Sequence, residues 1–189
     1  MSLKELIDNS RTDKNTTHSY LDLYQKLLSK KKHLATNVLE VGICKGGSIK
    51  LWRDFFVNAN IYGIDLMTEI EDNLWSDIIN DKKIKMLLGQ NGYDENFVNS
   101  EFMNKDIKFD FILDDGPHTL ETMKKFIKLY SPLIKDDGIL MIEDVQSINW
   151  IQPLINEVPE HLKKYIKAYD LRPNKNRYDD IVFTIDKSD

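Results

Sequence analysis

Residues 37–48 read NVLEVGICKGGS, and this stretch decides the fold. It opens with a short apolar run around one acid, which is typical of a buried strand. Gly42, Gly46 and Gly47 follow, and the apolar spacing of residues 48–56 then predicts a helix. Glycines let the backbone turn sharply and approach a ligand closely. The stretch therefore predicts a strand, a glycine-rich loop and a helix.

The same alternation continues along the rest of the chain. Short apolar runs predict further strands over residues 61–65, 84–88, 109–113, 138–142, 165–170 and 181–185. Apolar residues at helical spacing predict helices over residues 19–32, 69–80, 94–102, 119–134 and 147–157. The polar segment 171–180 separates the last two strands, so these should form an antiparallel hairpin. Together the pattern predicts an α/β, Rossmann-like, doubly wound, mainly parallel seven-stranded sheet.

Length and composition indicate a single domain. The chain has 189 residues, of which 41% are hydrophobic, so we expect an N-terminal arm and helix over 1–33 and a Rossmann-like core over 34–189. Cys44 is the only cysteine, which suits a reducing compartment. No apolar stretch approaches the ~20 residues of a membrane span, and the N-terminus lacks the pattern of a signal peptide. A cytoplasmic protein without membrane contact is therefore expected.

The charge distribution argues against a nucleic-acid partner. The net charge is −5, and the densest basic run, Lys30-Lys31-Lys32, has no aromatic or basic companions nearby. We expect a small-molecule partner instead, and the sequence leaves a homo-oligomer open.

The glycine loop and the acid that follows it indicate a cofactor site. A helix start offers free N–H groups to a polar ligand, and Asp65 ends the second predicted strand, where a carboxylate can bind both ribose hydroxyls. Gln90 follows the third strand, where this fold usually meets an adenine edge, although it could equally be a loop amide in water. A nicotinamide-binding loop would need glycine at Cys44. The alternative is a tight structural turn that binds no ligand.

Acidic residues gather at the ends of the fourth and fifth predicted strands. Asp114 and Asp115 end one strand, and Glu143 and Asp144 end the next. Carboxylates packed together repel one another or take up protons, and a divalent cation relieves this. Oxygen ligands favour Mg²⁺ first, then Mn²⁺ or Ca²⁺. We expect Asp115, Glu143 and Asp144 to bind the metal, the alternative being helix caps or solvated acids.

His118 stands three residues after Asp115, where a helix is expected to begin. A helix N-terminus disfavours the protonated imidazole, and a neutral histidine can act as a general base. The alternative is that His118 only caps the helix, a role for which Thr119 competes.

His18 and Tyr20 lie in and after a polar stretch that precedes the first predicted helix. This stretch could fold over the site as a lid, in which case both residues are candidates for substrate contact. It could equally be a surface arm.

These motifs together resemble those of a known protein family. The run Glu-x-Gly-x-x-x-Gly is similar to the first motif of class I S-adenosylmethionine-dependent methyltransferases. More specifically, the chain resembles the Mg²⁺-dependent sugar O-methyltransferases of macrolide and tetracenomycin biosynthesis and the related cephalosporin-hydroxylase-like group. The matching pieces are Asp13-Lys14 with His18 and Tyr20, Leu39–Gly42 with Gly46–Ser48 and Trp52, Tyr62–Asp65, Asp115–His118 and Ile142–Asp144.

The resemblance implies specific roles. S-adenosylmethionine would bind to residues 42–48 and Asp65, with Asp114 beside its methionine part. Asp115, Glu143 and Asp144 would hold the metal, and His118 would deprotonate a sugar hydroxyl. The sequence departs from the family pattern at Cys44 in the glycine loop, at Pro117 in place of a serine, and before Gln90.

The function that follows is metal-assisted O-methylation of a hydroxyl on a sugar, sugar nucleotide or glycan precursor. One alternative keeps the cofactor and changes the acceptor to a catechol or another small aromatic molecule. The other is a non-catalytic Rossmann module that binds a nucleotide.

Overall fold

The computed structural model describes residues 1–68, 76 and 78–188, and these residues form one seven-stranded sheet. The strand order is β3-β2-β1-β4-β5-β7-β6. The strands are β1 Asn37–Val41, β2 Asn60–Asp65, β3 Ile84–Leu88, β4 Phe109–Asp114, β5 Ile134–Ile142, β6 Ile166–Asp170 and β7 Ile181–Asp186.

The first five strands pair in parallel, and the last two join the sheet through antiparallel pairing. Val41 of β1 pairs with Ile64 of β2 and with Asp114 of β4, and Asp114 pairs with Ile142 of β5. The carboxyl ends of these four strands are therefore level with one another. Strand β7 runs antiparallel to both β5 and β6. The expected Rossmann-like sheet with a C-terminal hairpin is confirmed.

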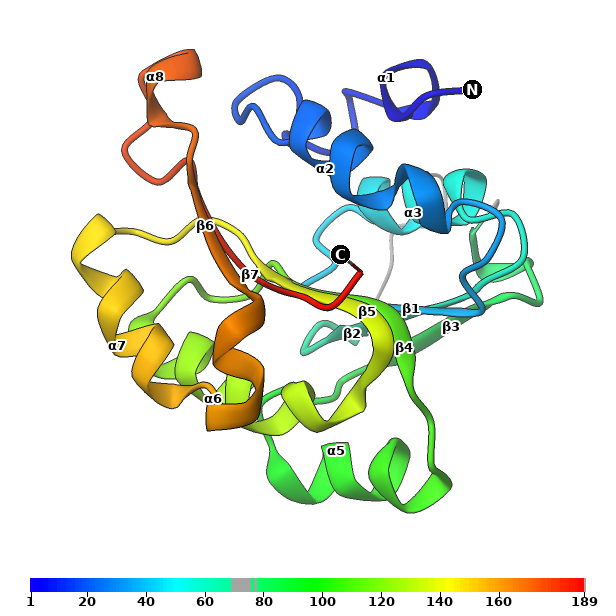
Figure 1. Cartoon of the computed structure of the whole chain (residues 1–189). Helices are drawn as coiled ribbons and strands as arrows, with labels where there is room; N and C mark the ends of the chain where they lie inside the picture. Colours follow the sequence, from blue (N-terminus) through cyan, green and yellow to red (C-terminus); the bar gives the residue numbers. More distant parts are fainter. Residues whose placement is uncertain (69–75, 77, 189) are drawn as a thin grey trace.

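Helices cover both faces of the sheet (Figure 1). Helices α1, α2 and α3 lie over one face and α5, α6 and α7 over the other, while α8 lies at the far end of the β6–β7 hairpin. The bounds are α1 Leu3–Leu6, α2 Leu21–Leu28, α3 Gly47–Phe55, α5 Glu95–Glu101, α6 Leu120–Tyr130, α7 Ile151–Glu157 and α8 Arg172–Lys175, with 3₁₀ turns at 29–31, 103–105, 131–133, 148–150 and 160–165.

Each face of the sheet has its own hydrophobic core. Trp52 of α3 packs edge-on against Phe111 of β4 in the first core, with a centroid separation of 5.4 Å. Phe126 and Tyr130 of α6 pack at 4.6 Å in the second. Burial of such large aromatic side chains supplies much of the hydrophobic stabilisation, so α3 and α6, which follow the β1 and β4 ends, are firmly placed.

Several predicted boundaries differ from the structure, among them the start of the helix expected over 147–157, which begins as a 3₁₀ turn before α7, and the two that follow. We expected a helix to residue 134, but α6 ends at Tyr130 and a 3₁₀ turn with Pro132 near its start follows. Strand β5 begins at Ile134 instead of Gly138, because a register shift lets Lys135–Asp137 extend the strand despite their polarity. The predicted helix over residues 69–80 lies largely outside the described residues.

A search of the described residues for membrane spans finds no helix with the length and apolar character needed to cross a bilayer.

Candidate active site

A cavity of about 740 Å³ opens at the carboxyl ends of the parallel strands. This position is the usual ligand site of doubly wound sheets, and the volume suits a cofactor-sized molecule. The lining residues come from the ends of five strands and the loops after them, from α6 and from the N-terminal arm. They are Asp13, Val41–Cys44, Ile64–Met67, Gln90–Tyr93, Asp115–His118, Thr122, Lys125 and Asp144.

Gly42 brings the loop after β1 into close contact with the end of β4. Its φ is +90°, and a Cβ there would lie 2.0 Å from the carbonyl oxygen of Asp115. The amide of Asp115 in turn donates to the carbonyl of Val41 at 2.8 Å. Only glycine fits this conformation and this space. Gly42 therefore allows the loop after β1 to contact the end of β4 at the base of the cavity.

Asp65 orients the same loop from the other side. One oxygen of its carboxylate accepts hydrogen bonds from the amides of Ile43, at 2.8 Å, and Cys44, at 3.4 Å. The other oxygen accepts from the amide of Met67 at 3.0 Å. Each carboxylate oxygen has two lone pairs, so Asp65 keeps accepting capacity toward the cavity that it lines.

The remaining predicted cofactor residues divide into two groups. Gln90 lines the cavity, and its amide is tied to the carbonyl of Asp65 at 3.0 Å. Gly46, at φ +69°, caps α3, Gly47 faces the arm at Arg11, and Ser48 is buried, so these three shape the loop and helix behind the cavity wall.

Asp114 lies behind the cavity wall, where Tyr93 covers it. The Tyr93 hydroxyl donates to the Asp114 carboxylate, and burial raises the pKa of that carboxyl to about 7. Gly116 makes room for this contact, because a Cβ there would lie 1.9 Å from the tyrosine oxygen. No local pattern in the sequence signals this contact, because it joins two separate strand ends.

Asp115, His118 and Asp144 form a cluster inside the cavity. One ligand atom from each lies within 4.8 Å of the others. The His118 Nε2 atom is 3.9 Å from Asp115 Oδ1 and 3.7 Å from Asp144 Oδ2. Both His118, at φ 53°, and Asp144, at φ 54°, have left-handed backbone conformations. Such conformations cost free energy and gather at functional sites.

The N-cap of α6 is Thr119, whose Oγ1 accepts from the amide of Thr122 at 3.2 Å. The imidazole of His118 is therefore not occupied as a helix cap. Its side chain is about a third exposed, toward the cavity that it lines.

Glu143 lies apart from this cluster. Its buried carboxylate accepts hydrogen bonds from the Lys14 ammonium and the Tyr24 hydroxyl. Lys14 also contacts Asp115 Oδ2 at 2.6 Å and lies 3.6 Å from the buried Glu40. The structure therefore brings two of the three predicted metal ligands together in the cavity, and the Lys14 ammonium bridges one of them, Asp115, to the third, Glu143.

The pKa shifts reflect this buried charge cluster. Burial raises the pKa of Glu143 to about 7 although Lys14 opposes the rise, and burial likewise raises the pKa of Glu40 to about 7. Burial acts to lower the pKa of Lys14, but the carboxylates of Asp115, Glu143 and Glu40 outweigh it and hold that pKa well above its ordinary value. Lys14 is therefore the counter-charge of this region. From the sequence alone, Lys14 was identified only as part of the motif match.

The N-terminal arm, residues 12–20, packs onto the strand ends instead of projecting into solvent. Tyr20 is fully buried, and its hydroxyl donates to Asp144. The His18 ring stacks on Tyr20 with centroids 5.0 Å apart, and its Nδ1 lies 3.2 Å from Asp144 Oδ1. Asp13 lines the cavity, whereas His18 and Tyr20 do not. Both residues reach the cavity through Asp144.

Known proteins were compared with the chain by sequence and by structure. No protein-family profile matches it. It is 24% identical over 144 residues to mycinamicin VI 2''-O-methyltransferase of Micromonospora griseorubida, covering 70% of this chain and 33% of that protein. It is 27% identical over 158 residues to demethylmacrocin O-methyltransferase of Streptomyces fradiae, covering 78% and 37%.

A third relative is the 8-demethyl-8-(2-methoxy-alpha-L-rhamnosyl)-tetracenomycin-C 3'-O-methyltransferase of Streptomyces olivaceus. It is 26% identical over 135 residues, covering 68% of this chain and 32% of that protein. The chain therefore spans about a third of the length of these relatives. The expected resemblance to this group of O-methyltransferases is confirmed.

Solved structures show the same fold. The MycE methyltransferase from the mycinamycin biosynthetic pathway, in complex with Mg and SAH, superposes with a TM-score of 0.74 at 20% identity, covering 97% of this chain and 54% of that one. A putative caffeoyl-CoA O-methyltransferase from Staphylococcus aureus gives 0.57 at 17% identity, covering 87% and 81%.

Proposed function

We propose that this chain is an S-adenosylmethionine-dependent, divalent-metal-assisted O-methyltransferase that acts on a hydroxyl of a sugar or glycan precursor. The observation that carries this proposal is the content of one cavity. The loop after β1 and Asp65 lie on one side of it, and His118 with Asp115 and Asp144 lie on the other. A cofactor site and an acid–base site therefore share a single space.

On this proposal, the cofactor occupies the side formed by β1, β2 and β3. Asp65 accepts hydrogen bonds from the ribose hydroxyls, Gln90 meets the adenine, and Gly42 allows the backbone to approach. Gly46, Gly47 and Ser48 lie behind the cavity wall and act indirectly, by fixing the conformation of the loop and of the start of α3. Asp114 holds Tyr93 against the methionine side of the cavity.

The donor set fits a divalent cation. Carboxylate oxygens of Asp115 and Asp144 lie within reach of a common point inside the cavity, and Mg²⁺ prefers oxygen ligands completed by water. These two residues would hold the ion. Glu143, the third predicted ligand, would join them by exchanging its contact with Lys14.

His118 is proposed as the general base. When bound, S-adenosylmethionine supplies an electrophilic methyl group, and the cation makes an acceptor hydroxyl more acidic. The acceptor oxygen forms its bond to the methyl carbon as the sulfur–carbon bond breaks, and His118 takes the hydroxyl proton. The walls of the cavity hold the oxygen in line with the methyl group.

A sugar acceptor is favoured over a catechol because the substrate named for the Streptomyces olivaceus relative contains a rhamnosyl group. A nucleotide-binding module without catalysis would have no use for His118 and two acids in the ligand cavity.

The direct test is methyl transfer with matched acceptors. The chain should convert S-adenosylmethionine to S-adenosylhomocysteine in the presence of Mg²⁺ and a panel of sugar nucleotides and glycosides, with a mass increase on the sugar. A catechol at the same concentration serves as the competing acceptor. Turnover of the catechol alone would transfer the proposal to the aromatic alternative, and no turnover with any acceptor would count against catalysis.

A further inference from the structure

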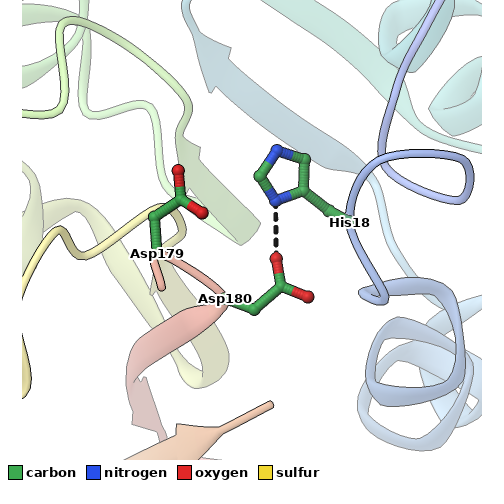
Figure 2. A group of neighbouring side chains, drawn as sticks. All are labelled: His18, Asp179 and Asp180. Atoms are coloured by element: carbon green, nitrogen blue, oxygen red, sulfur yellow. Dashed lines mark hydrogen bonds and ion pairs between the residues drawn. The ribbon is translucent and has the colours of Figure 1, made fainter. Parts of the chain in front are cut away.

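A second group of potential metal ligands lies outside the cavity. It consists of His18, Asp179 and Asp180, all buried, with one ligand atom from each within 4.8 Å of the others. Figure 2 shows the imidazole reaching in from the N-terminal arm and the two carboxylates from the chain at the start of β7. None of the three lines the active-site cavity.

One carboxylate oxygen in this group has no partner. Asp179 Oδ1 is buried and receives no hydrogen bond from any described residue, while its other oxygen receives one from Arg177 at 3.0 Å. No interaction joins Asp179 to the imidazole or to Asp180 in Figure 2. A buried charged oxygen without a partner is costly, and an ion is one of the few explanations for it.

The local charge is only partly compensated: the Arg177 guanidinium pairs with Asp179 at 3.0 Å, and the Ser19 hydroxyl donates to Asp180 at 2.9 Å. His18 Nδ1 lies 2.6 Å from Asp180 Oδ1 and 3.2 Å from Asp144 Oδ1, and its Nε2 lies 3.6 Å from Asp13 Oδ2. With Asp179, four carboxylates therefore surround one imidazole. Lys175 is near, but its ammonium donates to the backbone carbonyls of residues 15, 16 and 18. That lysine positions the arm and adds no ion pair to the group.

We propose that His18, Asp179 and Asp180 bind a divalent transition-metal ion, separate from the ion assigned to Asp115 and Asp144. One imidazole nitrogen with two carboxylate oxygens suits Zn²⁺, Co²⁺ or Mn²⁺ better than Mg²⁺. The ion would join segments that are 162 positions apart in the chain, at His18 and Asp180. It would thereby fasten the N-terminal arm to the C-terminal hairpin.

The test is Co²⁺ binding, measured by calorimetry and by visible absorption with Mg²⁺ in excess and without S-adenosylmethionine or acceptor. The wild type should bind one equivalent of Co²⁺. The visible absorption of the bound ion should be that of Co²⁺ with a nitrogen ligand. Asp179→Asn should weaken this binding at least about tenfold. The matched control Asp115→Asn should keep it, because the ion pairs that Asp115 forms with described residues are with Lys14 and His118 and with none of these three residues.

The proposal is overturned if the wild type binds no Co²⁺, or if Asp179→Asn binds it as tightly as the wild type. Circular dichroism checks that the variant folds. If it does not, imidazole ¹⁵N resonances of the wild type with Zn²⁺ decide the matter, since the His18 signal should shift and the exposed His161 signal should not. These measurements involve no methyl transfer, so their outcome is independent of the proposed activity.

Discussion

The ammonium of Lys14 lies 2.6 Å from Asp115 Oδ2, although 101 positions separate the two residues in the chain. The same ammonium contacts Glu143 and lies close to Glu40. The arm therefore delivers a buried positive charge to the acids that follow β4 and β5. This contact links Asp115 of the cavity cluster to the buried Glu143.

Replacing Lys14 by methionine should destabilise the protein strongly. The substitution leaves buried carboxylates without their counter-charge, and removing one partner of a buried pair typically costs about 3–5 kcal/mol. Urea unfolding measures the loss. The matched control is Lys4→Met, because Lys4 forms an exposed pair with Asp22 at 2.6 Å and should lose less than about 1 kcal/mol. Equal losses for both variants would show that the Lys14 contacts contribute little.

His118→Ala should reduce kcat by about 10²–10⁴-fold, which is the usual contribution of a general base. Affinity for S-adenosylhomocysteine should stay nearly unchanged, because His118 lies on the acceptor side of the cavity. Steady-state kinetics and calorimetry test the two statements separately. His161→Ala is the control, since His161 is exposed and is distant from His118 in the sequence. A His118 variant that keeps more than about a third of its activity would not support a base role.

Removal of divalent metal should abolish turnover. Asp115 and Asp144 would then face each other and the acceptor without a cation, and the acceptor hydroxyl would lose its acidifying partner. Dialysis against EDTA followed by an S-adenosylhomocysteine assay measures the loss, and added Mg²⁺ should restore the rate. Full activity after chelation would remove the metal from the mechanism and leave His118 as the only aid to deprotonation.

Asp110 should make stability depend on pH in the acid range. Burial acts to raise its pKa, but hydrogen bonds from Lys135 and from the amides of Asn37 and Thr36 outweigh this and lower the pKa. A lowered folded-state pKa means that the stabilisation is complete above the unfolded pKa, near 3.8, and is lost as pH falls through the folded value.

The Asp110→Asn variant should therefore be about 1–3 kcal/mol less stable than the wild type at pH 7. This difference should shrink below about pH 4. Urea unfolding at several pH values measures it. Asp22→Asn, which alters an exposed pair with Lys4, should change stability by under about 1 kcal/mol. A difference for Asp110→Asn that is constant with pH would contradict the charge-based explanation.

Local signals made much of the fold predictable. The strand, glycine loop and helix over residues 37–56 depend on neighbouring residues, and the structure reproduces them as β1 and α3. Strand ends at Asp65 and Asp114 followed from short apolar runs. The start of β5 did not, because Lys135–Asp137 are polar and lie in the register shift between the Phe109–Ile134 and Phe111–Ile139 pairs.

The directions of the side chains in the site could not be predicted from the sequence. Glu143 and Asp144 are neighbours, and the left-handed turn at Asp144 sends their carboxylates to different partners. Neighbouring acids at a strand end look equivalent in sequence, so all were expected at one ion. The contacts of Lys14 and Tyr24 with Glu143 depend on the tertiary packing of the arm and α2.

The most direct measurement of the central claim is calorimetry of S-adenosylhomocysteine and NADH with the wild type and Asp65→Ala. The account predicts micromolar-class binding of S-adenosylhomocysteine, about −8 kcal/mol, and no binding of NADH. Asp65→Ala should weaken the former by about 1–3 kcal/mol, since ribose hydroxyls lose their acceptor. Binding of NADH without binding of S-adenosylhomocysteine would contradict the account.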